Sequence, residues 1–128
     1  MSAPQVVLDV VACALGELRA LTAARDLPGL YSVAVEAGYP QPRVALGIGE
    51  DGPRPLLAWC KALRVEQGRC LSPSDHYPES RTTYATGGSL GGLPVRVSNS
   101  LSTEVAARLG DEWTVARLVE LVSGVRHG

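Results

Sequence analysis

The stretch Thr83–Asn99, TYATGGSLGGLPVRVSN, decides the fold. Its centre, Leu90-Gly91-Gly92-Leu93, is typical of a two-residue hairpin turn, because glycine readily reaches the positive φ values that tight hairpins need. Strands of alternating apolar residues flank this turn on both sides. An unbroken hairpin about it would place Thr86 opposite Val97 and Tyr84 opposite Asn99.

The two strands of this hairpin differ in regularity. Gly87 and Gly88 indicate a bulge, or a close approach by another backbone, in the first strand. Pro94 cannot donate a ladder hydrogen bond, so the second strand is predicted to begin there or to lie at an edge of the sheet. An exposed edge near Leu93–Asn99 would offer backbone groups to another chain.

Hydrophobic periodicity places the other elements on both sides of this hairpin. A period of two predicts strands, and spacings of three and four predict amphipathic helices. The glycine and proline clusters mark the breaks between them. In chain order we expect a helix over 4–24, a hairpin of strands at 31–37 and 43–48, a short helix at 55–63, a weakly patterned strand at 65–71, the central hairpin, and helices over 102–109 and 112–123.

This order of elements predicts an α+β fold. Strands joined by tight turns, with helices at both ends of the chain, are typical of an antiparallel sheet of about five strands with helices packed on one face. A length of 128 residues fits a single domain spanning 1–128. The sequence contains no Phe, so its core is expected to be aliphatic.

The net charge and the cysteine content indicate which classes of protein this chain can belong to. A formal net charge of −1 argues against the cationic footprint of a nucleic-acid-binding protein. The cysteines are odd in number, with no CxxC pair. Neither a signal-peptide pattern nor an apolar run of membrane-spanning length is present, so we expect a cytoplasmic protein with reduced thiols and no membrane association.

The reactive side chains gather in Arg69–Ser80, RCLSPSDHYPES, which raises the possibility of a catalytic or metal site. Asp75 and His76 are chain neighbours whose side chains diverge, so one cannot readily orient the other for catalysis. Cys70 and His76 lack the closely paired ligands of a structural zinc site. The prolines and small polar residues favour a turn-rich loop instead. We therefore predict no catalytic, cofactor-binding or metal-binding residues.

The segment Ser102–Val122, STEVAARLGDEWTVARLVELV, resembles a DNA-binding helix-turn-helix in the spacing of Ala106 and Gly110. The second helix is one residue too close for that motif, which rotates it by about 100°. It also offers few donors for base edges. A helix pair that packs into the core is the preferred interpretation, and DNA binding through Arg108 and Arg117 is the alternative.

The chain as a whole resembles small uncharacterised α+β proteins common in actinomycete-type bacterial genomes. The resemblance is carried by LLAWCKAL, Leu56–Leu63, and GGLPVRV, Gly91–Val97: a tryptophan-containing short helix followed by a Gly-Leu-Pro-Val strand. It implies no activity, because none is known for these proteins.

Taken together, these features favour a non-catalytic protein-binding or regulatory module that self-associates as a homodimer. The first helix carries a stripe suited to a helix–helix seam, and the expected edge strand could pair with another chain. The partner itself is not indicated by the sequence. The predicted partner-binding residues are Val7, Val11, Leu18, Val95, Arg96 and Val97.

Overall fold

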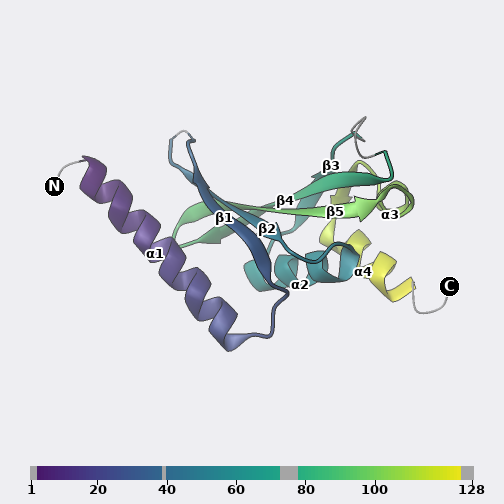
Figure 1. The fold of residues 1–128 in the computed structure, drawn as a ribbon, viewed down its shortest axis with the longest axis horizontal. Helices are drawn as coiled ribbons and strands as arrows, with labels where there is room; N and C mark the ends of the chain where they lie inside the picture. Colours follow the sequence, from purple (N-terminus) through teal and green to yellow (C-terminus); the bar gives the residue numbers. More distant parts are fainter. Residues whose placement is uncertain (1–2, 39, 73–77, 125–128) are drawn as a thin grey trace.

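A computed structural model describes residues 3–38, 40–72 and 78–124, with side chains described from residue 8 onward. The helices and strands follow the order that the hydrophobic periodicity predicts, with one additional short strand near the C-terminus (Figure 1). In order they are α1 (Ala3–Ala24), β1 (Leu30–Glu36), β2 (Arg43–Ile48), α2 (Pro53–Leu63), β3 (Gln67–Cys70), β4 (Ser80–Leu90), β5 (Leu93–Ser102), α3 (Thr103–Leu109), β6 (Glu112–Thr114) and α4 (Val115–Gly124).

The α+β class is confirmed, but the sheet is mixed rather than antiparallel. Within the described residues six strands form one sheet in the order β1-β2-β5-β4-β3-β6. Every neighbouring pair is antiparallel except β2 and β5, which run parallel. Two antiparallel hairpins thus lie side by side, and the parallel junction is where they meet.

The Gly91-Gly92 turn forms as predicted, and the register of its hairpin is shifted by one residue. Leu90 pairs with Leu93, and the ladder is irregular between Thr86 and Gly88. The bulge predicted at the glycine pair is therefore present, with Gly87 at φ 110°. Because a bulge opposes two residues to one, the partner of Thr86 is Arg96 rather than Val97.

This bulge decides which side chains of the central hairpin enter the core. With the shifted register Ala85 lies opposite Val97 and Thr83 opposite Asn99, and all four are buried. Pro94 is the second residue of β5, so the strand begins one residue before the predicted start.

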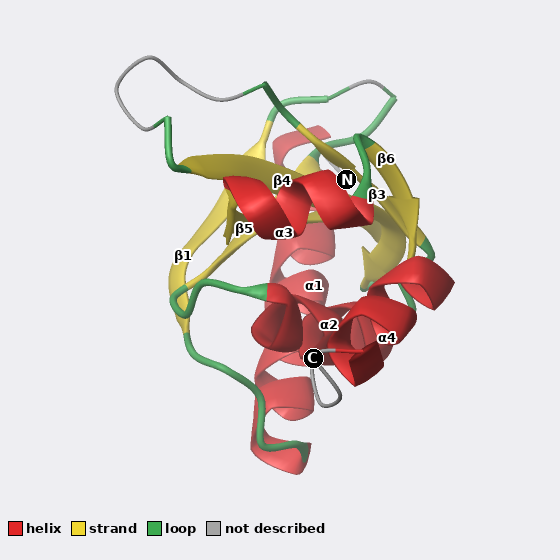
Figure 2. Cartoon of the chain, turned by 90° about the vertical axis from the view of Figure 1, so that its right-hand side faces the viewer, coloured by secondary structure: helices red, strands yellow, loops and turns green. Residues whose placement is uncertain are grey.

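α1, α2 and α4 lie on one face of the sheet, α3 follows β5 at the end of the sheet, and no helix of the described residues covers the other face (Figures 1 and 2). Among the described helices α2 contributes most to the core, because its buried apolar side is broad and has a buried tryptophan, Trp59, at its centre. The Trp59 indole N–H donates to the Pro28 carbonyl oxygen at 2.8 Å, which anchors the α1–β1 connection to α2. The helical core residues are Ala14, Leu18, Leu56, Leu57, Trp59, Cys60, Leu63, Ala106, Leu109 and Leu118.

Two buried polar side chains of the central hairpin satisfy their hydrogen bonds internally. Thr83 Oγ1 accepts from the Trp113 indole N–H at 2.9 Å and donates to the Arg69 carbonyl oxygen at 3.0 Å. The Asn99 side-chain amide donates to the Gly52 carbonyl oxygen at 2.8 Å, at the start of α2. The hydrogen bonds of Thr83 link β4 to β6 and β3, and the hydrogen bond of Asn99 links β5 to the start of α2.

The C-terminal segment differs from the predicted helix pair. Residues 112–114 form β6, which pairs with β3, and α4 begins three residues later than the predicted second helix. The cause is Trp113, whose ring fills the space over Gly68 and draws the segment into the sheet. Thr114 then caps α4 by accepting from the Arg117 backbone N–H at 3.2 Å.

Candidate protein-interaction surface

The strand predicted to lie at an edge is an interior strand. β5 lies between β2 and β4, with Val44 opposite Val95 and Leu46 opposite Val97. Both valines of β5 are buried in the core. The prediction of an edge at 93–99 is therefore wrong, because the other hairpin of the chain pairs with this strand. Val95 and Val97 have no surface to offer a partner.

Arg96 lies on the open face of the sheet, where groups of its own chain hold it. Its guanidinium forms a salt bridge with Glu36 at 3.0 Å and stacks over the Tyr84 ring, 4.4 Å from the ring centroid. Arg43 donates to the same carboxylate at 3.1 Å. One carboxylate thus joins two guanidiniums across β1, β2 and β5.

The predicted seam of α1 faces the chain's own core. Leu18 is buried and Val11 is partly buried against the hydrophobic core, so this stripe is used within the molecule. Val7 belongs to α1, and its side chain lies outside those that the structure describes. A second apolar flank remains exposed, formed by Leu8 and Leu15, which lie seven residues apart on one side of the helix.

The exposed strand edge lies at β1 and not at β5, where the sequence pattern predicts it. β1 is the longer of the two terminal strands of the sheet, the other being the three-residue β6, and β2 is its only neighbour among the described strands. Val33 is 46% exposed and Val35 is 42% exposed, although each points to the face where the helices lie. Their partners Leu46 and Val44 on β2 are buried.

An irregularity at the start of β1 separates its tyrosine from these valines. The register shifts between Leu30 and Ser32, and the Tyr31 ring lies over Gly47, where a Cβ would come within 2.7 Å of the ring. Gly47 lies between two inward-pointing residues, so Tyr31 covers the open face instead of the helix-covered face. The sequence pattern, which groups Tyr31 with Val33, misses this bulge.

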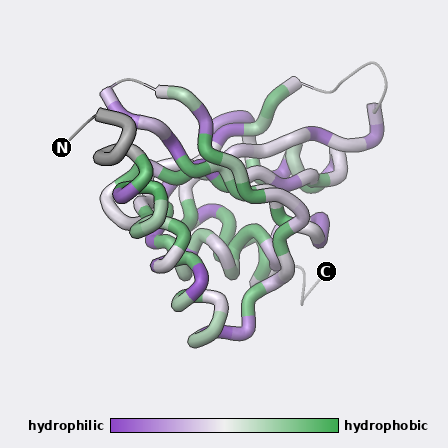
Figure 3. The backbone as a smooth tube through the Cα atoms, turned by 60° about the vertical axis from the view of Figure 1, so that its left-hand side comes forward, coloured by the Kyte–Doolittle hydropathy of each residue, from purple (hydrophilic) through white to green (hydrophobic). Residues whose placement is uncertain are grey.

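We define the edge surface as Leu8, Leu15, Val33 and Val35. All are large, apolar and exposed. α1 lies to the left of β1 in Figure 1, and Figure 3 shows hydrophobic positions along the helix that follows the N-terminus. The surface combines an unpaired strand edge with an apolar helix flank.

Two of the three thiols, those of Cys60 and Cys70, are buried, and that of Cys13 is exposed. Cys70 is buried at the end of β3, where its Sγ lies 3.6 Å from Thr83 Oγ1. Cys60 is buried in α2, and burial raises its pKa to about 12. The residues 73–77, which include Asp75 and His76, lie outside the described residues. In the described part, no three potential metal ligands come together.

The two arginines of the DNA-binding alternative are on exposed surfaces and have partners nearby. Arg108 pairs with Glu104 at 3.0 Å, and Arg117 pairs with Glu120 at 3.2 Å and donates to the Arg108 carbonyl oxygen at 3.0 Å. A strand separates α3 from α4, so the turn of a helix-turn-helix is absent at 110–114. The prediction of that connection is wrong.

No protein-family model, curated protein or solved structure matches this chain. No helix in the described residues is long and apolar enough to cross a membrane. The function is therefore inferred from the edge surface and from the chemistry of its residues.

Proposed function

We propose that this protein is a non-catalytic protein-binding module that associates with a second copy of itself through β1. The observation that carries the proposal is the exposure of Val33 and Val35 on a terminal strand of seven residues, whose outer edge has no partner among the described strands. Such an edge is a template for pairing with another strand, because a row of backbone N–H and C=O groups points outward from it.

The composition of β1 favours pairing. Natural edge strands that stay unpaired are commonly protected by lysine, proline, an inward-pointing charge or a β-bulge, and the irregularity of β1 lies only at its start, before Val33. The sequence LYSVAVE contains neither lysine nor proline. Its one charged residue, Glu36, is already in contact with Arg43 and Arg96. Two copies of β1 would therefore meet without repulsion between unpaired charges.

A two-fold arrangement suits this surface. In an isologous dimer each copy offers the same patch, and antiparallel pairing of two identical strands satisfies that symmetry. The sheet of one copy would continue into the sheet of the other. The valines would then lie beside those of the partner, and the burial of this apolar surface would stabilise the pair.

Light scattering coupled to size-exclusion chromatography tests the proposal. We expect a mass near twice 13.5 kDa at micromolar concentration, falling toward 13.5 kDa on dilution. High salt should change this equilibrium little, because the contact is apolar. A strict monomer at high concentration would contradict self-association.

A further inference from the structure

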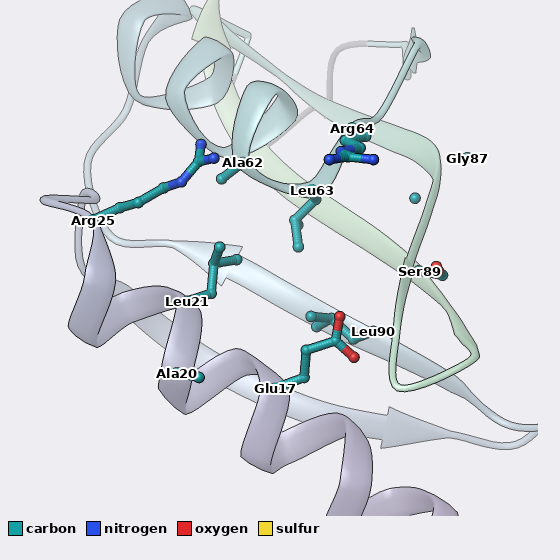
Figure 4. Close-up of a pocket in the computed structure, with 11 residues that line it drawn as sticks. Glu17, Ala20, Leu21, Arg25, Ala62, Leu63, Arg64, Gly87, Ser89 and Leu90 are labelled. Carbon is teal, nitrogen blue, oxygen red and sulfur yellow. The ribbon is translucent and has the colours of Figure 1, made fainter.

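A cleft of about 660 Å³ opens between α1, the end of α2 and the end of β4 (Figure 4). Its volume is within the range of about 300–1,000 Å³ that proteins use for ligands. Leu21, Leu63 and Leu90 give it an apolar floor. The cleft lies on the flank of α1 opposite Leu8 and Leu15, so it is separate from the edge surface.

The end of β4 offers backbone groups to this cleft. β3 pairs with β4 only as far as Thr86, and no other described strand continues the ladder on that side. Leu90 and Leu93 close the two-residue turn as a hydrogen-bonded pair, so Ser89 and Pro94 form the next, non-hydrogen-bonded pair. Pro94 has no N–H to donate, which agrees with its place in a non-hydrogen-bonded pair. The N–H and C=O of Ser89 therefore point away from β5, on the side of the cleft.

The two ends of the cleft carry opposite charge. Arg25 follows the last residue of α1, and Arg64 is the left-handed C-cap of α2, with φ 58°. Figure 4 shows both guanidiniums at one end of the cleft and Glu17 at the other. Among the described residues neither guanidinium has an ion-pair or hydrogen-bond partner. The Glu17 carboxylate accepts a hydrogen bond from the Gly91 backbone N–H, at the turn.

The opposite charges at the two ends of the cleft indicate which chemical group of a ligand binds at the arginine end and in which direction a peptide would run. Guanidiniums bind carboxylate and phosphate groups through charge-assisted hydrogen bonds, and a carboxylate is the group that a peptide carries at its C-terminus. β4 runs from the arginine end of the cleft at Gly87 to the Glu17 end at Leu90. A peptide with its C-terminal carboxylate at the arginine end would therefore run antiparallel to β4.

We propose that the cleft binds the C-terminal end of an extended peptide, which pairs antiparallel with β4 at Ser89 and places its carboxylate between Arg25 and Arg64. Backbone pairing to a free strand edge and capture of a terminal carboxylate are both established modes of peptide recognition. Glu17 and Arg25 are separated by about 12 Å along α1. A strand of about four residues spans that length.

Nuclear magnetic resonance titration of the full chain tests this site with a defined probe, acetyl-Thr-Val-Thr-Leu bearing a free C-terminal carboxylate. We expect the backbone amide signals of residues 87–90 to shift, and the Ser89 amide to become protected from hydrogen exchange. The same peptide with a C-terminal carboxamide should bind about tenfold more weakly, because it lacks the charge that the guanidiniums bind.

Two double variants of equal net charge distinguish binding at Arg25 and Arg64 from a general effect of lost positive charge. The double variant R25Q/R64Q should bind the free-acid peptide about tenfold more weakly. The control R19Q/R54Q removes two arginines that do not line the cleft and should bind like the wild type. Absence of shifts at 87–90 with millimolar peptide, or equal binding by R25Q/R64Q, would overturn the proposal. Binding of acetyl-leucine as tightly as the peptide would also overturn it, because strand pairing would then contribute nothing.

Discussion

Val33 lies opposite Leu46 in the β1–β2 ladder, yet Leu46 is 1% exposed whereas Val33 is 46% exposed. The two side chains share one face of the sheet, so the difference arises from what covers each strand. The helical layer covers β2 and leaves the terminal strand partly open. A single strand spacing of about 4.8 Å thus separates the hydrophobic core from an exposed apolar edge.

The double variant V33K/V35K should weaken self-association by at least about tenfold, because lysine on an edge strand opposes pairing with a like-charged copy. Both side chains are half exposed, so the monomer should keep its fold and its circular dichroism spectrum. The matched control is Leu71→Lys, since Leu71 is exposed apolar surface of similar extent, at 40%, and lies just after β3. Equal dimerisation by V33K/V35K and the control would show that β1 is not the contact.

Thr83→Val should reduce the free energy of unfolding by about 1–3 kcal/mol, because the indole N–H of Trp113 loses its buried acceptor. Valine has nearly the same shape, so packing changes little. Urea denaturation measures the effect, with Thr83→Ser expected to retain most of the stability. The exposed neighbour Thr82→Val serves as a control and should cost little. Equal stabilities for the substitutions at 83 and 82 would contradict a structural role for this hydroxyl.

Gly68→Ala should destabilise the fold by about 1–3 kcal/mol, because a Cβ at Gly68 would lie 2.1 Å from the ring of Trp113. Release of β6 from β3 would accompany the loss and appear as a change in tryptophan fluorescence. Gly16→Ala is the contrasting substitution, since nothing lies within 4 Å of its added Cβ. In the interior of α1 that change should stabilise by about 0.5–1 kcal/mol. A neutral effect at Gly68 would show that the tryptophan does not pack there.

Raising the pH above 9 should lower stability through Cys60. Burial raises the pKa of this thiol from its ordinary value of 9.0 to about 12. Between these values the unfolded chain loses the proton while the folded chain keeps it, so the unfolded state is favoured as pH rises. The loss is about 1.4 kcal/mol per pH unit in that range.

Urea denaturation at pH 8 and pH 10, for the wild type and Cys60→Ala, measures this effect. The wild type should lose more stability than the variant over that interval, because other titrating groups are common to both. The same burial predicts that iodoacetamide at pH 8 modifies the exposed Cys13 before Cys60. Identical pH dependence in both proteins would contradict the shift in pKa.

Both hairpins and the first two helices could be predicted because their signals are local. Glycine pairs, alternating valines and the helical spacing of Leu56, Trp59 and Leu63 report on neighbouring residues. The parallel junction of β2 with β5 could not be predicted, because no local pattern says which strands of two hairpins will meet. That junction moves the exposed edge from β5 to β1.

The C-terminal strand shows a second limit of sequence patterns. Three residues are too few for the alternating pattern of a strand to be recognised. The helical spacing of the apolar residues also extends from this segment into α4, so the sequence predicts one continuous helix. Only the tertiary contact of Trp113 with Gly68 makes the segment extended. The cleft beside β4 could not be predicted either, because its lining residues come from α1, the end of α2 and the end of β4, which are distant in the sequence.

Isotope-filtered nuclear Overhauser spectroscopy on an equal mixture of labelled and unlabelled protein tests the pairing of β1 most directly. Pairing through this strand predicts intermolecular contacts among residues 30–36 of the two copies, with Val33 near the two-fold axis. A dimer whose intermolecular contacts fall elsewhere, with none at β1, would contradict it.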